Sequence, residues 1–210
     1  AAAAVFAGAA ALAGFPENIQ VVDVPPVSPE AEARVAPYLE YRTAAFQGWH
    51  PVRREALLIT RFSETAQLHS VRAPMGARRQ LTFGAEPILG GGHRPRTGEM
   101  VVYSQDVGGG EFYQLFRLDA ATGAVTLLTD GKSRNSAPRW AASGKEFAFS
   151  STRRNGRDTD IYVMSPDDPA SSRLVFEARG GGWSALDWSP DESKLLVKQY
   201  ISNNESQLHL

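Results

Sequence analysis

One serine in the sequence has neighbours that could make it a nucleophile. Gly182-Trp183-Ser184-Ala185-Leu186 is close to the pattern G-x-S-x-G, in which two glycines permit the strained strand-to-helix turn that exposes a serine for acyl transfer. Leu186 replaces the second glycine, and the one histidine downstream, His209, lies in a repeated strand pattern. We therefore expect Ser184 to lie in a loop, and we assign no catalytic residue to this chain.

Metal-binding side chains are sparse. The chain has no cysteine, and its four histidines, at positions 50, 69, 93 and 209, form no His-x-x-x-His pair. Three of them recur at repeat positions or beside a repeat anchor, which favours a structural role. We expect no metal and no other cofactor.

The densest charged cluster is Arg153, Arg154 and Arg157, followed at once by Asp158 and Asp160. Arginines on one loop can receive a substrate carboxylate or an acidic surface of a partner domain. The two aspartates lie close enough to offset the positive charge, and they resemble acids that hydrogen-bond to nearby backbone in turns. The interpretation as a solvated, structural loop therefore competes with the functional one.

Three further motifs favour turns. Asp167 and Asp168 are flanked by prolines, and glycine triplets at 90–92, 108–110 and 180–182 suggest reversals of the chain. Gly131-Lys132-Ser133 resembles the end of a phosphate-binding loop, but Thr126 stands where that motif needs its first glycine. We expect no nucleotide site, and only the arginine loop and Glu111 remain as weak candidates for contact with substrate or a catalytic domain.

A short sequence motif recurs along the chain and indicates the scaffold that positions these side chains. Its four copies begin at positions 49, 93, 140 and 188, an interval typical of propeller blades. The copies are Trp49-His50-Pro51, His93-Arg94-Pro95, Trp140-Ala141-Ala142 and Trp188-Ser189-Pro190.

Strand-like segments follow each copy in the same order. The first is rich in the β-branched and aromatic residues that strands favour, and it is found at 56–59, 100–103, 147–149 and 195–197. A second begins with Gln or Asp, at 67–69, 114–116, 160–162 and 207–209. A third, at 79–83, 125–129 and 173–176, has no counterpart after the fourth copy.

These repeats predict an all-β fold, a partial β-propeller of about three full blades and part of a fourth. The predicted blades are 45–83, 84–131, 132–180 and 181–210, within an incomplete propeller of residues 45–210. Residues 16–44 form a lead-in, in which Ser28-Pro29-Glu30 predicts the start of one short helix that Pro37 should end or kink. Since propellers usually close with about 4 to 8 blades, we expect the sequence to be a fragment of a longer protein.

Several phrases make the chain similar to known propellers. Trp188-Ser189-Pro190-Asp191, Ser150-Ser151-Thr152-Arg153 and the segment 158–164 resemble the repeats of TolB-like propellers and of the N-terminal domains of prolyl oligopeptidase-family serine peptidases. The segments 41–49 and 60–69 resemble the first blade of bacterial dipeptidyl-aminopeptidase or acylaminoacyl-peptidase-like members of that family.

The resemblance to the peptidases implies a propeller that screens short peptide substrates for a C-terminal α/β-hydrolase domain carrying the Ser, Asp and His. This chain would then be the non-catalytic part of an exported serine peptidase. The alternative is a TolB-like periplasmic propeller that binds a protein partner and performs no chemistry. A lactonase-like or lyase-like propeller enzyme with a metal in its channel is disfavoured, because inward His or Glu residues do not repeat at matching positions.

Composition and the first residues bear on partners and location. A formal net charge of −1 gives no general attraction to nucleic acid or anionic lipid, so we expect no nucleic-acid partner. Residues 1–15 are apolar and uncharged, too short for the ~20 residues of a membrane span. They fit the apolar part of a secretory signal, with Ala11-Leu12-Ala13 as a cleavage site, or an Ala-rich tail without that role. We expect no membrane span and a periplasmic or secreted protein.

Overall fold

The computed structural model describes residues 22–136 and 138–210, and the chain divides into two compact units, Ala1–Tyr41 and Arg42–Leu210. In the first unit, α1 (Pro29–Leu39) begins where expected: the Ser28 hydroxyl accepts a hydrogen bond from the Ala31 amide at 3.1 Å. The helix continues two residues beyond Pro37, since a proline so near the C-terminal end removes few helical hydrogen bonds. The predicted apolar segment 1–15 lies outside the described residues.

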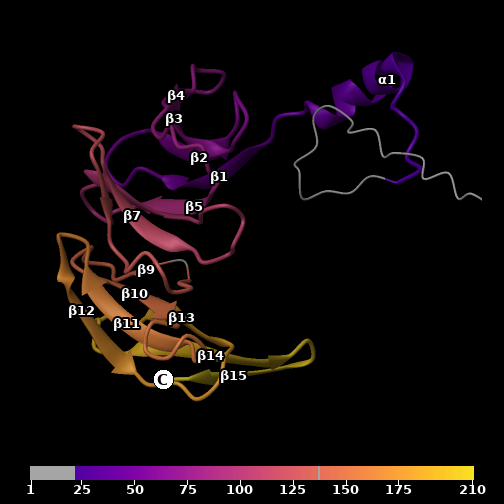
Figure 1. The fold of residues 1–210 in the computed structure, drawn as a ribbon. Helices are drawn as coiled ribbons and strands as arrows, with labels where there is room; N and C mark the ends of the chain where they lie inside the picture. The colour runs from indigo at the N-terminus through magenta and orange to yellow at the C-terminus, as the bar shows by residue number, and fades with distance from the viewer. Residues whose placement is uncertain (1–21, 137) are drawn as a thin grey trace, which may run out of the picture. The chain divides into compact units, whose positions relative to one another are not determined.

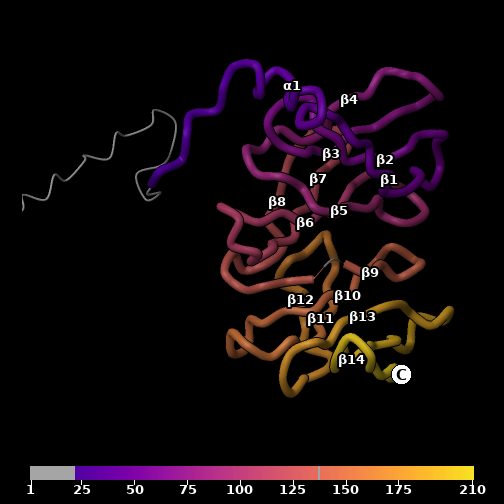
Figure 2. The backbone as a smooth tube through the Cα atoms, turned by 90° about the vertical axis from the view of Figure 1, so that its right-hand side faces the viewer, coloured from indigo at the N-terminus to yellow at the C-terminus, as the bar shows by residue number. Residues whose placement is uncertain are grey.

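The second unit consists of four antiparallel sheets, each built from consecutive strands. Their orders are β1-β2-β3-β4, β5-β6-β7-β8, β12-β11-β10-β9 and β13-β14-β15, which we call blades 1 to 4. Figures 1 and 2 show them following one another in chain order. The strands are β1 (Ala44–Trp49), β2 (Ala56–Thr60), β3 (Gln67–Val71), β4 (Arg79–Gln80), β5 (Ile88–His93), β6 (Met100–Gln105), β7 (Gln114–Asp119), β8 (Val125–Leu127), β9 (Arg139–Trp140), β10 (Phe147–Ser151), β11 (Asp160–Ser165), β12 (Asp168–Phe176), β13 (Trp183–Trp188), β14 (Leu195–Ser202) and β15 (Glu205–His209).

This arrangement confirms the predicted fold class, an all-β partial propeller with one short helix. The first residue of the recurring motif is the last residue of the first strand in every blade. These residues pair with the first or second residue of the next strand, and they are Trp49, His93, Trp140 and Trp188. In β1, β5 and β13 one residue bulges out of the pairing, at Gln47, Leu89 and Leu186. The fourth blade has three strands, as the missing third segment predicted.

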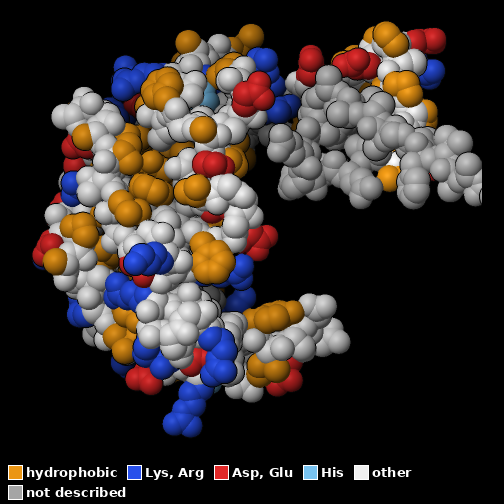
Figure 3. All heavy atoms as spheres, viewed as in Figure 1, with side chains coloured by type: hydrophobic (Ala, Val, Ile, Leu, Met, Phe, Trp, Pro, Cys, Tyr) orange, Lys and Arg blue, Asp and Glu red, His pale blue; other side chains and the backbone are white. Residues whose placement is uncertain are grey.

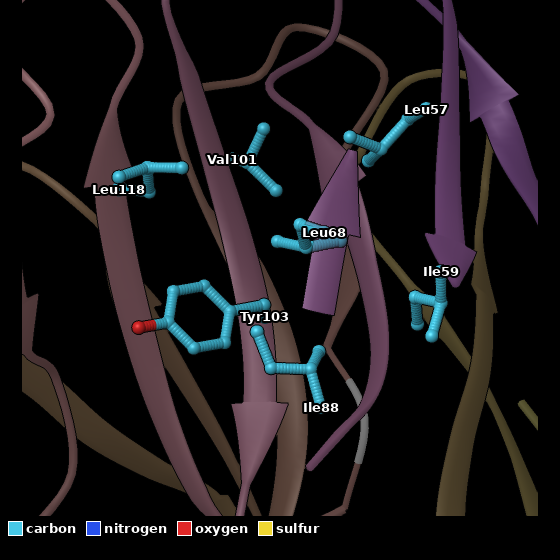
Figure 4. Close-up of a cluster of buried hydrophobic side chains, with 7 residues drawn as sticks. All are labelled: Leu57, Ile59, Leu68, Ile88, Val101, Tyr103 and Leu118. Carbon is cyan, nitrogen blue, oxygen red and sulfur yellow. The ribbon is translucent and has the colours of Figure 1, made fainter. Parts of the chain in front are cut away.

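The hydrophobic core lies between neighbouring blades. The first cluster joins β2 and β3 of blade 1 to β5, β6 and β7 of blade 2, and Figure 4 shows its side chains pointing toward one another. Its buried members are Leu57, Ile59, Leu68, Ile88, Val101, Tyr103 and Leu118. A second cluster joins blades 2 and 3, and a third joins blades 3 and 4. Because each sheet buries apolar residues against the next, the blades stabilise one another in sequence.

Two local predictions were wrong. The triplet Gly90-Gly91-Gly92 is part of β5 and not a turn. A side chain at Gly91 would begin 3.1 Å from the Cβ of Tyr103 and 3.3 Å from Leu68 Cδ2, so glycine lets β5 approach blade 1 closely. Ser184 likewise lies in a strand, β13, and not in a loop.

In blades 1 and 2 the fourth strand is shorter than the sequence suggested, because a side chain takes over its pairing. The amide of Leu68 donates to the hydroxyl of Thr82, and the amide of Leu115 donates to that of Thr129, both at 3.0 Å. These hydroxyls stand in for the backbone carbonyls of a continued ladder. As a result, β4 and β8 contain only two and three residues.

Candidate functional site

Ser184 lacks the geometry of a nucleophile elbow. It pairs with Lys198 in the middle of an antiparallel ladder, whereas an elbow lies between a strand and a helix. The His209 ring packs on the indole of Trp183, with centroids 5.2 Å apart. Successive side chains of a strand point to opposite faces, so His209 and Ser184 lie on opposite faces of the blade 4 sheet.

The charged cluster after β10 forms a closed ion-pair network. Arg154 bonds to both oxygens of Asp160, at 2.7 and 3.0 Å, and to Asp158 at 3.2 Å. Asp160 is fully buried and also accepts from the Ala178 amide at 2.8 Å. Asp158 has its pKa lowered to about 2, mainly by the Asn155 amide and further by Arg157. Arg154 therefore neutralises a buried acid and has little capacity left for a ligand.

The two other arginines of that loop differ in their side-chain contacts and exposure. The Arg153 guanidinium lies 3.6 Å from the Tyr162 ring centroid and donates to the Ser172 hydroxyl at 2.8 Å. Arg157 bonds to Asp158 at 3.2 Å, but its side chain remains 83% exposed. Of the three candidate arginines of this loop, only Arg157 has a largely exposed side chain.

Glu111, the other predicted contact residue, belongs to a small exposed group on the β6–β7 loop. Its carboxylate bonds to Arg134 at 3.4 Å, and the Arg134 guanidinium lies 5.5 Å from the ring centroid of Phe112. Phe112 and Val107 are 53% and 77% exposed. Because the β6–β7 and β10–β11 hairpins lie at the same end of their sheets, this group and Arg157 share one face of the propeller, which we call the loop face.

The remaining motifs have structural roles. The Asp130 carboxylate accepts from the amides of Lys132 and Ser133, at 3.0 and 2.8 Å, so Gly131-Lys132-Ser133 is an Asx turn. Asp167 lies in the β11–β12 turn and binds Arg94 of blade 2 through both oxygens, at 3.1 and 2.9 Å. The residues thought to form turns thus fasten loops or neighbouring blades.

Two histidines that the sequence left apart meet between blades 1 and 2. The rings of His50 and His93 lie 4.7 Å apart between centroids, and Nε2 of His50 and both ring nitrogens of His93 are buried without a hydrogen-bond partner. Burial, followed by the charge of His50, lowers the pKa of His93 to about 4. Burial and Arg53 lower the pKa of His50 as well. Both rings are therefore neutral near pH 7.

Two cavities lie between neighbouring blades, and each is large enough for a small ligand. The larger, of about 480 Å³, lies between blades 1 and 2 and includes Arg53, Arg72, Arg79 and His93 in its wall. The other, of about 380 Å³, lies between blades 3 and 4 and is lined largely by apolar and aromatic side chains such as Trp183, Trp188 and Phe176. Sequence reasoning missed the larger cavity, because its arginines are scattered over three separate segments.

Within residues 22–136 and 138–210, no three His, Asp or Glu side chains lie close enough to hold a metal ion. In the same described part, no helix is long and apolar enough to cross a membrane. The predictions that the chain uses no metal and no cofactor stay predictions.

Comparison with known sequences finds short regions of similarity. The chain is 35% identical over 79 residues to the Tol-Pal system protein TolB of Francisella tularensis, a stretch that covers 38% of this chain and 18% of that protein. It is 32% identical over 88 residues to the uncharacterized peptidase YuxL of Bacillus subtilis, covering 42% of this chain and 13% of YuxL. No family model matches the chain.

Comparison with solved structures establishes the fold. A protein assigned as TolB from Agrobacterium tumefaciens superposes with a TM-score of 0.59 at 19% identity, over 74% of this chain and 54% of that one. An oligogalacturonate lyase from Vibrio parahaemolyticus superposes with a TM-score of 0.60 at 9% identity, over 77% of this chain and 48% of the lyase. The chain thus spans about half the length of these structures. Its fold is that of a TolB-like β-propeller.

Proposed function

We propose that this chain is a polypeptide-binding propeller that screens short peptides for a serine peptidase. The observation that carries the proposal is the loop face, where Phe112, Arg134 and Glu111 form an exposed aromatic and charged group on a rigid sheet scaffold. Aromatic residues and arginine are the side chains most enriched at the energetic centres of protein interfaces. Figure 3 shows hydrophobic and basic side chains together on one surface of the blades.

The similarity to YuxL and the first-blade phrases at 41–49 and 60–69 support a peptidase parent. In such an enzyme the reaction belongs to a separate α/β-hydrolase domain, and the propeller restricts access by its size. A folded protein cannot reach a catalytic serine through the loops of a propeller, whereas a short peptide can. The contribution of this chain to the reaction is then selection of the substrate and not bond cleavage.

The second candidate function is a TolB-like propeller that binds a protein and has no enzymatic partner domain. The similarity to TolB in sequence and fold favours it. Both candidates place a polypeptide on the blades, and they differ in whether chemistry accompanies binding.

Export from the cytoplasm is part of both candidates. The support is the apolar, uncharged composition of residues 1–15, which fits a secretory signal. We propose a division into this segment, a lead-in of 16–44 and a propeller portion of 45–210.

The test uses the natural full-length protein that contains this chain. We expect it to react covalently with a fluorophosphonate probe and to hydrolyse short chromogenic peptides but not a folded protein. We expect Arg134→Ala to raise KM about tenfold, equal to about 1.4 kcal/mol of binding. Lys145→Ala, an exposed charge on the β9–β10 hairpin at the opposite end of the sheets, serves as the control and should leave KM unchanged.

Two results would count against the proposal. Absence of both labelling and hydrolysis would reject the peptidase function and leave the TolB-like binding function. Full activity with an unchanged KM in Arg134→Ala would show that the loop face does not contact the substrate.

A further inference from the structure

The cavity between blades 1 and 2 has an excess of hydrogen-bond donors on one wall. Glu55 is buried and binds the Nε atoms of Arg53 and Arg72 at 3.2 and 3.3 Å. Burial opposes ionisation of Glu55, but its hydrogen bond to Ser70 and the two arginines outweigh that effect and lower its pKa. Each of these two guanidinium groups spends only its Nε–H on this acid, so their terminal N–H groups are left for the cavity.

A third arginine in that wall has no internal partner. The side chain of Arg79 makes no hydrogen bond and no ion pair with any residue in the described part of the chain, and the residue begins the short strand β4 opposite Ser70. Arg53 and Arg72 are 49% and 70% exposed at the side chain, so all three cations reach solvent in the cavity. Glu55 therefore pairs with two of the three guanidinium groups, and the third has no acidic partner in the described part of the chain.

The carboxylates of the opposite wall are already occupied. Glu99 bonds to Arg94 at 2.9 Å. Asp119 accepts hydrogen bonds from the amides of Thr122 and Ala121 and from the Thr122 hydroxyl, and these bonds lower its pKa. Neither acid forms an ion pair with Arg53, Arg72 or Arg79 in the described part of the chain.

His93 is a neutral member of the cavity wall. Its ring lies beside the arginines, and both ring nitrogens are buried beneath the surface of the cavity. Burial and the neighbouring His50 lower its pKa to about 4. The ring therefore adds no charge to the wall near pH 7.

We propose that this cavity binds a carboxylate of a peptide. The arginines provide planar pairs of N–H groups that match a carboxylate in a bidentate manner. The apolar wall contributed by Leu81, Val101 and Leu118, two of which are shown in Figure 4, accepts the aliphatic part of the adjoining residue. A dianionic phosphate fits less well, because Glu99 and Asp119 face it from blade 2.

The cavity and the loop face lie at opposite ends of the sheets. Arg53 belongs to the β1–β2 hairpin, and Arg72 and Arg79 flank the β3–β4 hairpin, while the loop face is formed by hairpins between second and third strands. The inference rests on the chain being a polypeptide-binding propeller, but it names a different surface and a chemical group that must be present on the peptide.

The test measures binding to the chain itself and needs no peptidase activity. The Arg Nε–H signals of ¹⁵N-labelled protein are followed by NMR during three separate titrations. The first peptide is acetyl-Ala-Ala-Leu as the free acid, and the second is the same peptide with a C-terminal amide. The third is acetyl-Ala-Glu-Ala-amide, which carries its carboxylate on a side chain. We expect the free acid to shift the Arg79 signal to saturation and the amide to bind at least tenfold more weakly. Equal binding by the third peptide would assign the site to acidic side chains as well as to chain ends.

Variants separate binding from folding. Arg79→Gln removes a side chain without an internal partner, so the fold should persist while the affinity for the free acid falls at least tenfold. Arg139→Gln, which removes an exposed arginine of β9 that does not line the cavity, is the matched control and should bind normally. The inference is wrong if acid and amide bind equally, if Arg79→Gln binds as the unaltered chain does, or if inorganic phosphate binds more tightly than the peptide acid.

Discussion

Replacing Gly98 by alanine should destabilise the protein far more than the same change at an otherwise similar glycine. Gly98 lies in the β5–β6 hairpin with φ of +71°, and an added Cβ would lie 2.4 and 2.5 Å from the His50 ring atoms Cε1 and Nε2. Gly109, in the β6–β7 hairpin of the same blade, has φ of +70° and nothing within 4 Å of an added Cβ. The two sites share backbone strain and differ in the clash.

The expected free energies follow from these two contributions. A left-handed backbone costs an alanine roughly 1–2 kcal/mol, and this applies to both variants. At Gly98 the His50 ring must also move, although it is 3% exposed and packs on His93, and overpacking of this kind costs about 1–3 kcal/mol more. We expect Gly98→Ala to lose about 2–5 kcal/mol and Gly109→Ala about 1–2 kcal/mol.

Urea unfolding followed by tryptophan fluorescence measures both values, and a double variant tests the cause. His50 caps its own turn, where Nδ1 accepts from the amides of Val52 and Arg53 at 3.2 Å. At the equivalent position of blade 4 the hydroxyl of Ser189 accepts from the Lys194 amide. Because a serine hydroxyl can also accept from amides of the turn that follows it, His50→Ser removes the ring and keeps an acceptor. In the His50→Ser background, Gly98→Ala should cost no more than Gly109→Ala. Equal losses for the two single variants, or no relief in the double variant, would refute the reasoning.

Two further predictions concern the boundary between blades 1 and 2. Gly91→Ala should lower the free energy of unfolding by about 1–3 kcal/mol, because its Cβ would press on Tyr103 and Leu68, whereas Gly92→Ala, whose nearest atom is Trp140 Nε1 at 3.8 Å, should be nearly neutral in urea titrations. Lowering the pH should destabilise the fold through His93, whose pKa falls from 6.5 to about 4 on folding. Between those values the unfolded chain binds a proton that the fold does not. The loss is at most about 3 kcal/mol, and about 1–2 kcal/mol once partial exposure is allowed for. In His93→Gln, unfolding measured from pH 7 to pH 4 should depend less on pH, and an unchanged pH dependence would contradict this assignment.

The repeated architecture could be predicted from the sequence because each blade repeats its own local signals. A Trp or His ends the first strand, and Gln67, Gln114 and Asp160 begin the third strands. Gln67 donates to the carbonyls of Gly84 and Glu86, Gln114 donates to that of Ser133, and Asp160 accepts from the Ala178 amide. One polar residue thus fastens the link to the next blade each time, so the pattern repeats with the structure.

The features that sequence reasoning missed depend on contacts between blades. Glycine triplets indicate turns by local propensity, but the close approach of Tyr103 to Gly91 holds one triplet in a strand. The cavity brings Arg53, Arg72 and Arg79 together with His93 across a blade boundary. The spacing of these residues along the sequence does not predict that they lie close together. Arg154 could be identified as basic but not as the partner of a fully buried acid six residues later.

The blade boundaries also restrict how a gene for this protein can be rearranged. Blades 1 and 2 meet through His50 and His93, blades 2 and 3 through Arg94 with Asp167 and the Gly144 carbonyl, and blades 3 and 4 through Ser143 with Glu192. The three contacts use different chemistry at similar places, so a blade copied or moved by recombination would bring mismatched groups together. Deleting blade 2, for example, would set His50 against Trp140, which holds the position of His93 in blade 3. The contacts at each blade boundary are therefore specific to that pair of blades, and repeats that look interchangeable in sequence fit only their own neighbours.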